Sequence, residues 1–314
     1  MDTTSTPPSD PPAAETPTTC FRHPRRETYV RCSRCDRYIC PDCMREAPVG
    51  FRCPVCIKED NRTVREARTV FGGRTVTVPL VTYALITLTV LAYLVELAVP
   101  GVVELFYNVG AVLVDADGAH YVDDGSPYSG YEQAGVLHGE WYRLVTSAFL
   151  HQLPGNGIFG IAHIALNMYW IWVLGRILEE RLGHARLTAV YLLSAVGGSV
   201  LGVLVDPGQA ALGASGAVFG LAACYVVLTR KLHHHPLDGR HLMVMFVLWL
   251  VLSASFTSWE GHLGGLLAGG VTALGLAFAP RDRRGLVHAL VIGGVTVLLV
   301  GLVVLKSLQF AGTL

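Results

Sequence analysis

The chain has 314 residues, of which 52% are apolar and only 15% are charged, whereas about 25% of residues are charged in a typical soluble domain. Its 24 basic and 24 acidic residues balance, so no net field recruits an acidic partner and no nucleic acid is expected as a ligand. This composition excludes a soluble globular enzyme and a disordered chain. Residues 1–78 hold 13 basic and 10 acidic residues, and the remaining 236 hold 11 and 14, so we expect a polar N-terminal part before a membrane part.

The N-terminal part begins with residues 1–19, which are rich in Thr, Pro, Ser and Ala. They have neither a basic start nor an apolar run, which predicts a disordered tail rather than a secretory signal. Four ligand pairs with two-residue spacers follow within residues 20–57. The pairs are Cys20 with His23, Cys32 with Cys35, Cys40 with Cys43, and Cys53 with Cys56. Seven thiolates and one imidazole suit two tetrahedral zinc ions.

We expect two structural zinc ions to carry the folding of the 20–57 module, because so short a segment cannot bury a sufficient core. The four residues between Cys35 and Cys40 favour a cross-brace, in which the first and third pairs share one ion and the second and fourth share the other. A redox or disulfide module is the alternative, disfavoured by the odd cysteine count and by a cytosolic placement. The ligand order resembles a B-box-type zinc finger, which implies a cytosolic protein partner.

A basic linker at 58–78 precedes seven apolar runs of the length that crosses a bilayer as a helix, about 20 residues. These runs cover roughly 79–99, 158–175, 187–205, 212–229, 242–258, 260–279 and 286–305. Their length and their Leu, Val, Ala and Gly content favour helices over the short alternating strands of a membrane barrel. We therefore predict an all-α polytopic membrane protein with seven spans in a lipid bilayer.

The basic residues indicate the orientation of these spans. For seven spans, 22 of the 24 basic residues fall on one side, and only Arg143 and Lys306 fall on the other. By the positive-inside rule, we expect a plasma-membrane protein with a cytoplasmic N-terminus and an extracytoplasmic C-terminus. The 100–157 connection then lies outside. It is too long for a plain linker, and we expect it to fold onto the membrane surface.

Three groups of polar residues lie within the apolar runs, where polar side chains are costly and usually functional. Ser215, flanked by small residues at 213–216, has the uncrowded side chain and free N–H groups that a nucleophile at a helix N-terminus needs; close helix packing is the alternative. His262 can serve as a general base or bond a neighbouring helix. His163 and Asn167 share one helix face and can bind an oxyanion or join two helices.

Depth connects these groups. Counted from the basic end of each span at about 1.5 Å per residue, Ser215, His163 and His262 lie about 22, 20 and 28 Å in, within the outer half of a core about 30 Å thick. A serine, a base and oxyanion donors at one depth suggest acyl transfer to water. Glu96 lies near the outer end of the first span, and no acidic residue lies deep in a span near the three. A Ser-His dyad is therefore the simpler prediction.

Together these residues resemble the rhomboid intramembrane serine proteases over about residues 79–280. The motifs are Trp141-Tyr142-Arg143, His163-x-x-x-Asn167 continuing as Met168 to Gly175, Gly213-x-Ser215-Gly216, and His262-x-x-Gly265-x-x-x-Gly269. The resemblance implies a six-helix core around a cavity open to the outside, with residues 281–314 adding a C-terminal helix. It also implies that Ser215 is the nucleophile, that His262 is its general base, and that catalysis needs no cofactor.

The resemblance assigns further roles. His163, Asn167 and the Ser215 N–H would form the oxyanion hole, with Gly213 in support. Arg143 and Trp141 would brace the 100–157 segment.

Two positions depart from the family's pattern. Phe219 stands where many members have a Tyr that stacks on the catalytic His, and Gly261 stands where Ala is common. Phe keeps the stacking face and loses the hydroxyl, so activity is compatible with this residue.

Three functions compete. The leading hypothesis is an endopeptidase that cleaves transmembrane proteins near the outer leaflet. A non-proteolytic binder of membrane clients is the second, and it makes the pairing of Ser215 with His262 a coincidence. A transporter is the third; it predicts internal repeats and charges near the midplane, and the sequence has neither.

Overall fold

The structure is a computed structural model that describes residues 18–63, 67–126, 128–232, 236–253 and 258–312. The chain divides into two compact units, Met1–Glu66 and Ala67–Leu314. The predicted tail at 1–19 lies almost wholly outside the described residues. Residues 254–257, near the end of the predicted apolar run at 242–258, also lie outside them. The predicted domain limits at 19, 57, 78 and 280 stay predictions.

The N-terminal unit is built from short strands around a core of six cysteines and Ile39. Strand β1 (Thr19–Cys20) pairs antiparallel with β2 (His23–Glu27), and β3 (Arg45–Glu46) pairs antiparallel with β4 (Phe51–Arg52). The 3-10 helix Pro41–Cys43 lies between these pairs in sequence, and helix α1 (Pro54–Thr63) follows them. Asp60 of α1 forms ion pairs with Arg34 and Arg52, so α1 packs on the unit.

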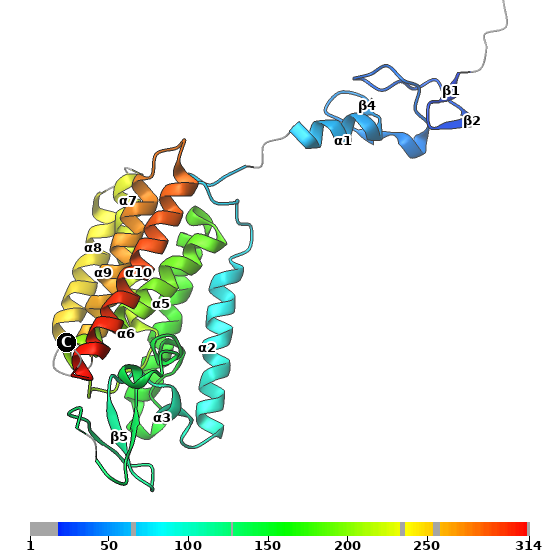
Figure 1. Ribbon diagram of the computed structural model, residues 1–314. Helices are drawn as coiled ribbons and strands as arrows, with labels where there is room; N and C mark the ends of the chain where they lie inside the picture. Colours follow the sequence, from blue (N-terminus) through cyan, green and yellow to red (C-terminus); the bar gives the residue numbers. More distant parts are fainter. Residues whose placement is uncertain (1–17, 64–66, 127, 233–235, 254–257, 313–314) are drawn as a thin grey trace, which may run out of the picture. The chain divides into compact units, whose positions relative to one another are not determined.

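Long helices run side by side in the second unit (Figure 1). They are α2 (Leu80–Ala98), α5 (Ile158–Leu182), α6 (His184–Val205), α7 (Ser215–Lys231), α8 (Pro236–Ser253), α9 (Trp259–Phe278) and α10 (Arg284–Phe310). Each overlaps one of the seven predicted apolar runs. The all-α polytopic prediction is confirmed, with one small domain before the helices.

Five of these helices are long and apolar enough to cross a bilayer, within the described part of the chain: α2, α5, α6, α9 and α10. The apolar stretch of α8 is shorter, at Arg240–Val251. Helix α7 has 17 residues and ends in Arg230 and Lys231. At about 1.5 Å per residue it is shorter than a bilayer core about 30 Å thick.

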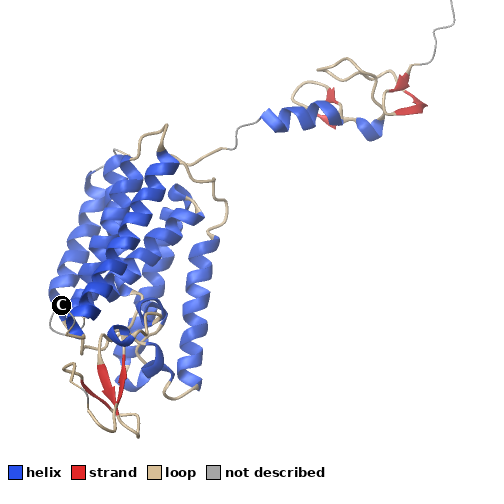
Figure 2. Ribbon diagram, in the orientation of Figure 1, coloured by secondary structure: helices blue, strands red, loops and turns tan. Residues whose placement is uncertain are grey.

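The segment between α2 and α5 is folded and lies at one end of the bundle, where Figure 2 shows its strands in red. It contains helix α3 (Val102–Phe106), helix α4 (Arg143–Thr146) and an antiparallel sheet in the order β6-β5-β7. The strands are β5 (Val112–Val114), β6 (His120–Val122) and β7 (Glu132–Ala134). Three 3-10 helices complete it, at Val136–His138, Ser147–Phe149 and Pro154–Asn156. The sequence analysis did not predict the sheet.

A buried carboxylate fastens the first turn of α2 to α5. Glu179 of α5 accepts hydrogen bonds from the N–H groups of Val81 and Thr82, both at 2.8 Å, and from the Thr82 hydroxyl at 2.6 Å. His184 lies 2.5 Å from the same carboxylate. Because the first N–H groups of a helix lack intrahelical partners and carry partial positive charge, a carboxylate is their natural acceptor.

Candidate active site

Ser215 and His262 meet at the starts of two neighbouring helices. Ser215 is the first residue of α7, and His262 lies in the first turn of α9. Their side chains form a hydrogen bond, with Ser215 Oγ 2.9 Å from His262 Nε2. Ser215 is half-buried and His262 is 5% exposed. A hydroxyl in hydrogen-bond contact with a buried imidazole has the arrangement of an activated nucleophile and its base.

Glycines place the two helices close enough for this contact. A Cβ on Gly265 of α9 would lie 2.0 Å from the carbonyl oxygen of Gly216 on α7. A Cβ on Gly198 of α6 would lie 2.5 Å from the carbonyl oxygen of Gly261. Side chains at these positions would force the three helices apart, so the small residues of the sequence motifs set the separation of the dyad.

Phe219 covers the inner side of the imidazole. Its ring stacks on that of His262 with centroids 4.5 Å apart and planes inclined by 15°. Phe219 follows Ser215 by four residues, so both side chains lie on the same face of α7. The stacking expected at this position is present without a hydroxyl.

His163 of α5 lies beside the turn that leads into Ser215. Gly213 has a φ of 123°, and a Cβ there would lie 2.8 Å from both Cε1 and Nε2 of the His163 ring. Only glycine adopts this backbone conformation without strain and leaves room for the ring. The Nδ1 atom of His163 accepts a hydrogen bond from the Gln152 N–H at 3.4 Å. Nε2 is thus the nitrogen beside the 213–215 turn.

Asn167 is buried one turn along α5 from His163, and its amide donates to the His163 carbonyl oxygen at 2.9 Å. The Ser215 N–H is the first of α7, and the first N–H groups of a helix have no partner within that helix. The second amide hydrogen of Asn167, the His163 Nε2–H and this N–H are the donors that the predicted oxyanion hole would use, and that hole stays a prediction.

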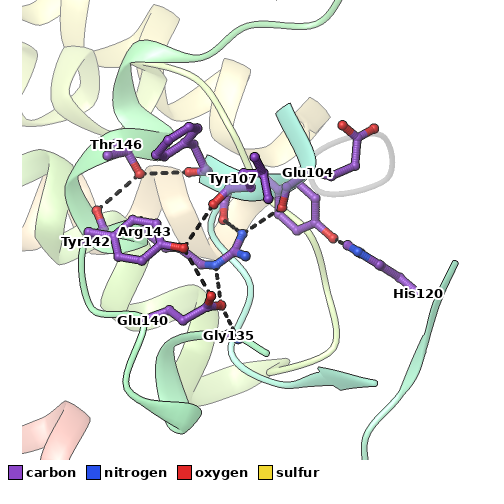
Figure 3. Close-up of polar contacts among 10 residues, drawn as sticks. Glu104, Tyr107, His120, Gly135, Glu140, Tyr142, Arg143 and Thr146 are labelled. Carbon is purple, nitrogen blue, oxygen red and sulfur yellow. Dashed lines mark hydrogen bonds and ion pairs between the residues drawn. The ribbon is translucent and has the colours of Figure 1, made fainter. Parts of the chain in front are cut away.

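Arg143 lies inside the folded segment at 100–157, among polar groups of that segment (Figure 3). Its buried guanidinium donates to Glu140 at 2.8 Å and to the carbonyl oxygens of Glu104 and Tyr107 at 2.9 and 3.1 Å. Glu140 also accepts the Gly135 N–H at 2.6 Å. Arg143 thus joins α3, α4 and the residue after β7.

Trp141 is 42% exposed, and within the described residues its side chain makes no hydrogen bond or ring contact. The contacts of Arg143 are compatible with the predicted bracing role, which stays a prediction for both residues.

Two buried polar residues, one of them packed against His163, received no role from the sequence. Glu96 is 3% exposed and accepts the His151 N–H. His151 is fully buried, and its ring lies 5.0 Å from that of His163 between centroids. The sequence offered one signal for this contact, which is the carboxylate of Glu96 near the end of the first apolar run. Its partner, the His151 N–H, is a backbone group, and no sequence motif marks it.

The predicted metal ligands of the N-terminal unit gather into two groups of four. Cys20, His23, Cys40 and Cys43 form one group, and Cys32, Cys35, Cys53 and Cys56 form the other. Within each group the ligand atoms all lie within 4.8 Å of one another. This grouping is the cross-brace that the spacing favoured. Three thiolates with one imidazole, and four thiolates, are both donor sets that fit tetrahedral zinc.

Comparison with known proteins places the membrane unit. The Rhomboid domain model matches residues 138–278. The chain is 32% identical to the rhomboid protease GluP of Bacillus subtilis over 51% of this chain and 31% of GluP. It is 31% identical to the rhomboid protein YdcA of the same organism over 48% of this chain and 74% of YdcA.

It is also 36% identical to the rhomboid protease GlpG of Yersinia pseudotuberculosis, over 41% of this chain and 45% of GlpG. The chain thus spans less than half the length of GluP and of GlpG, and about three quarters of YdcA. The Rhomboid domain match covers the helices that carry Ser215 and His262. The chain is a multi-pass membrane protein that belongs to the rhomboid family.

Proposed function

We propose that this rhomboid family member is an intramembrane serine endopeptidase that cleaves transmembrane proteins near the outer leaflet. The observation that carries the proposal is the 2.9 Å hydrogen bond between Ser215 Oγ and His262 Nε2. It joins two residues 47 positions apart at helix starts that glycines bring together. The names of GluP and GlpG as rhomboid proteases support the same activity.

The geometry supports a two-step reaction. Ser215 Oγ attacks the scissile carbonyl carbon while His262 Nε2 takes the hydroxyl proton. The tetrahedral intermediate collapses as His262 gives that proton to the leaving amine, which forms an acyl-enzyme on Ser215. Water then attacks the ester, with His262 again as the base, and releases the second product.

Three donors would stabilise the negative oxygen of the intermediate: the His163 Nε2–H, the Asn167 amide and the Ser215 N–H. The first two are side chains of α5, and the third belongs to the N-terminus of α7, which carries partial positive charge that favours a negative oxygen. Removal of one such donor typically costs about 10²–10³ in kcat.

Substrates of this proposed protease are membrane-spanning proteins. A helix buries its own carbonyl groups in hydrogen bonds, so it must unwind locally before Ser215 can reach one. Small or helix-breaking residues near the outer end of a substrate helix would ease that step.

For the N-terminal unit, we propose two structural zinc ions held by the two groups of four ligands, and a cytosolic protein as the partner of the module. Zinc would supply the folding energy that this small core lacks. We propose the plasma membrane as the location, with the N-terminus cytoplasmic and the C-terminus extracytoplasmic, because of the distribution of basic residues.

The test is labelling by a fluorophosphonate serine-hydrolase probe of the detergent-purified chain, beside Ser215→Ala and His262→Ala. We expect the wild type to be labelled, Ser215→Ala to be unlabelled, and His262→Ala to react at least about 10³-fold more slowly, because loss of a dyad member removes the activated nucleophile.

A matched control is Thr296→Ala, which deletes a hydroxyl from the exposed face of α10 and should label as the wild type does. Folding of each variant is checked by its thermal transition. A folded wild type that is not labelled, or labelling that survives Ser215→Ala, would contradict the proposed dyad and favour a non-proteolytic binder.

A further inference from the structure

Glu96, at the end of α2, is a buried carboxylate with a backbone partner. Its side chain is 3% exposed. Its two carboxylate oxygens lie 3.0 and 3.3 Å from the backbone nitrogen of His151 and accept the hydrogen of that N–H group. Glu96 and His151 are 55 residues apart in the chain. The contact therefore fixes the segment that leads into α5 against the far end of a different helix.

The neighbouring backbone group sets the protonation of His163. The Gln152 N–H lies 3.4 Å from His163 Nδ1 and can only donate, so Nδ1 must present a lone pair. A neutral His163 then carries its proton on Nε2. That nitrogen faces Gly213, where a Cβ would come within 2.8 Å of it, beside Ser215. The hydrogen bond from Gln152 thus makes Nε2 a donor at the side where an oxyanion would form.

The segment at 151–155 packs on α5 on one side, where a Cβ on Gly160 would lie 2.3 Å from the Leu153 carbonyl oxygen, and faces a cavity on another. Together with Glu96 and Glu104, its residues His151, Gln152, Leu153 and Gly155 line a cavity of about 310 Å³. A chain segment that borders an open space is not locked by close packing on that side. The hydrogen bonds that its backbone makes to Glu96 and to His163 therefore add to the packing on α5 in fixing the 151–152 backbone.

We propose that Glu96 is a positioning residue for the oxyanion hole: by holding the His151–Gln152 backbone, it orients His163 and keeps the His163 proton on Nε2. The inference rests on the proposed function, because it concerns a donor of the proposed oxyanion hole. Within the described residues Glu96 is hydrogen-bonded to the His151 N–H and to neither Ser215 nor His262, so it acts through the backbone of the 151–152 segment. The buried His151 ring, which packs against the ring of His163, is carried by the same backbone.

The first readout is spectroscopic and independent of catalysis. The full chain is labelled with ¹⁵N-histidine, and the His163 signals are identified by their loss in His163→Ala. We expect a protonated Nε2 and an unprotonated Nδ1 in the wild type, and a mixture of tautomers in Glu96→Ala. Glu96→Gln should keep the wild-type signature, because its amide oxygen still accepts the His151 N–H. The opposite tautomer in the wild type, or an unchanged signature in Glu96→Ala, would overturn the proposal.

The second readout is the rate constant for fluorophosphonate labelling of Ser215. Glu96→Ala should slow labelling about tenfold to a hundredfold. This effect should not exceed that of losing an oxyanion donor. Glu96→Gln should keep most of the wild-type rate. In a His163→Ala background, Glu96→Ala should change the rate less than about twofold, because the residue through which it acts is gone.

The matched control is Glu104→Gln, which removes a carboxylate from the same cavity and should leave the rate unchanged. If Glu96→Ala slows labelling as much in the His163→Ala background as in the wild type, the role is merely structural and the proposal fails. A folded wild type that is not labelled at all would instead contradict the proposed function, and the tautomer measurement would still decide the role of Glu96.

Discussion

The two units of this chain are stabilised by opposite means. The N-terminal unit buries six cysteines and one isoleucine in its core. The residues that form this core are therefore mostly the same residues that we expect to bind metal. The membrane unit instead brings helix backbones together at glycines and joins distant segments with buried carboxylates. The first unit should therefore respond to loss of a ligand and tolerate small changes in volume. The second should respond to a single added methyl group and ignore chelators.

The largest expected effect that separates the units is metal removal. Binding of structural zinc in small modules is worth about 10–16 kcal/mol, so a strong chelator should unfold residues 18–63 and leave the helices of the second unit intact. Limited proteolysis of the chelated chain, with helicity followed by circular dichroism, measures both. If residues 18–63 stay resistant to protease after chelation, metal does not carry their folding.

Single cysteines sharpen this test. Metal analysis should give two zinc ions per chain for the wild type and one for Cys40→Ser. Cys224→Ala is the matched control, since Cys224 is buried in α7 outside both ligand groups, and it should retain two.

An added methyl group tests the other half of the comparison. In Gly265→Ala the new Cβ would lie 2.0 Å from the carbonyl oxygen of Gly216, so α7 and α9 must separate. We expect a loss of about 1–3 kcal/mol in stability, and fluorophosphonate labelling slower by at least about tenfold because the dyad spans this contact.

The control for this change is Gly294→Ala in α10, where a Cβ meets nothing within 4 Å. It should be neutral or stabilise the helix by up to about 1 kcal/mol. Equal thermal transitions for the two variants would show that glycine spacing does not hold α7 against α9.

The smallest expected effect concerns acid. Partial burial raises the pKa of Glu140, but hydrogen bonds from Arg143 and the Gly135 N–H outweigh burial and leave that pKa below its ordinary value. A depressed folded pKa means that the carboxylate stabilises the 100–157 segment fully above the ordinary pKa of about 4.3, and that this contribution is lost as the pH falls through the lower folded value.

We expect the contribution to be about 1 kcal/mol, because Glu140 is partly exposed. Hydrogen exchange of residues 132–146 at pH 6 and pH 3, corrected for the intrinsic effect of pH, measures it. Glu140→Gln should remove most of the difference, whereas Glu132→Gln, at an exposed carboxylate of β7, should leave it in place. A difference that survives Glu140→Gln belongs to another group.

The sequence predicted the helices well, because a run of about 20 apolar residues has few structures available in a bilayer. It also predicted Ser215 and His262 as partners, since small residues beside a nucleophile and a base form recognisable patterns. The contacts of Glu96, Glu179 and Arg143 could not be predicted from the sequence. Their partners include backbone N–H and carbonyl groups, which every residue carries and which leave no trace in a residue pattern. The three-stranded sheet escaped notice because its strands have only three residues each.

The attachment of α2 has a practical consequence. Of its four buried residues, Thr82, Leu85, Thr89 and Glu96, three are polar, and most of its surface is apolar and open to lipid. Hydrocarbon solvates that surface as well as a neighbouring helix would, so the polar bonds at its two ends hold it in place. Such bonds are strong in a dry interior and weak where water competes for them. Whether α2 stays bound during purification therefore depends on how much water reaches these bonds. A small micelle that admits water would loosen α2, whereas the glycine contacts between α7 and α9 would stay in place.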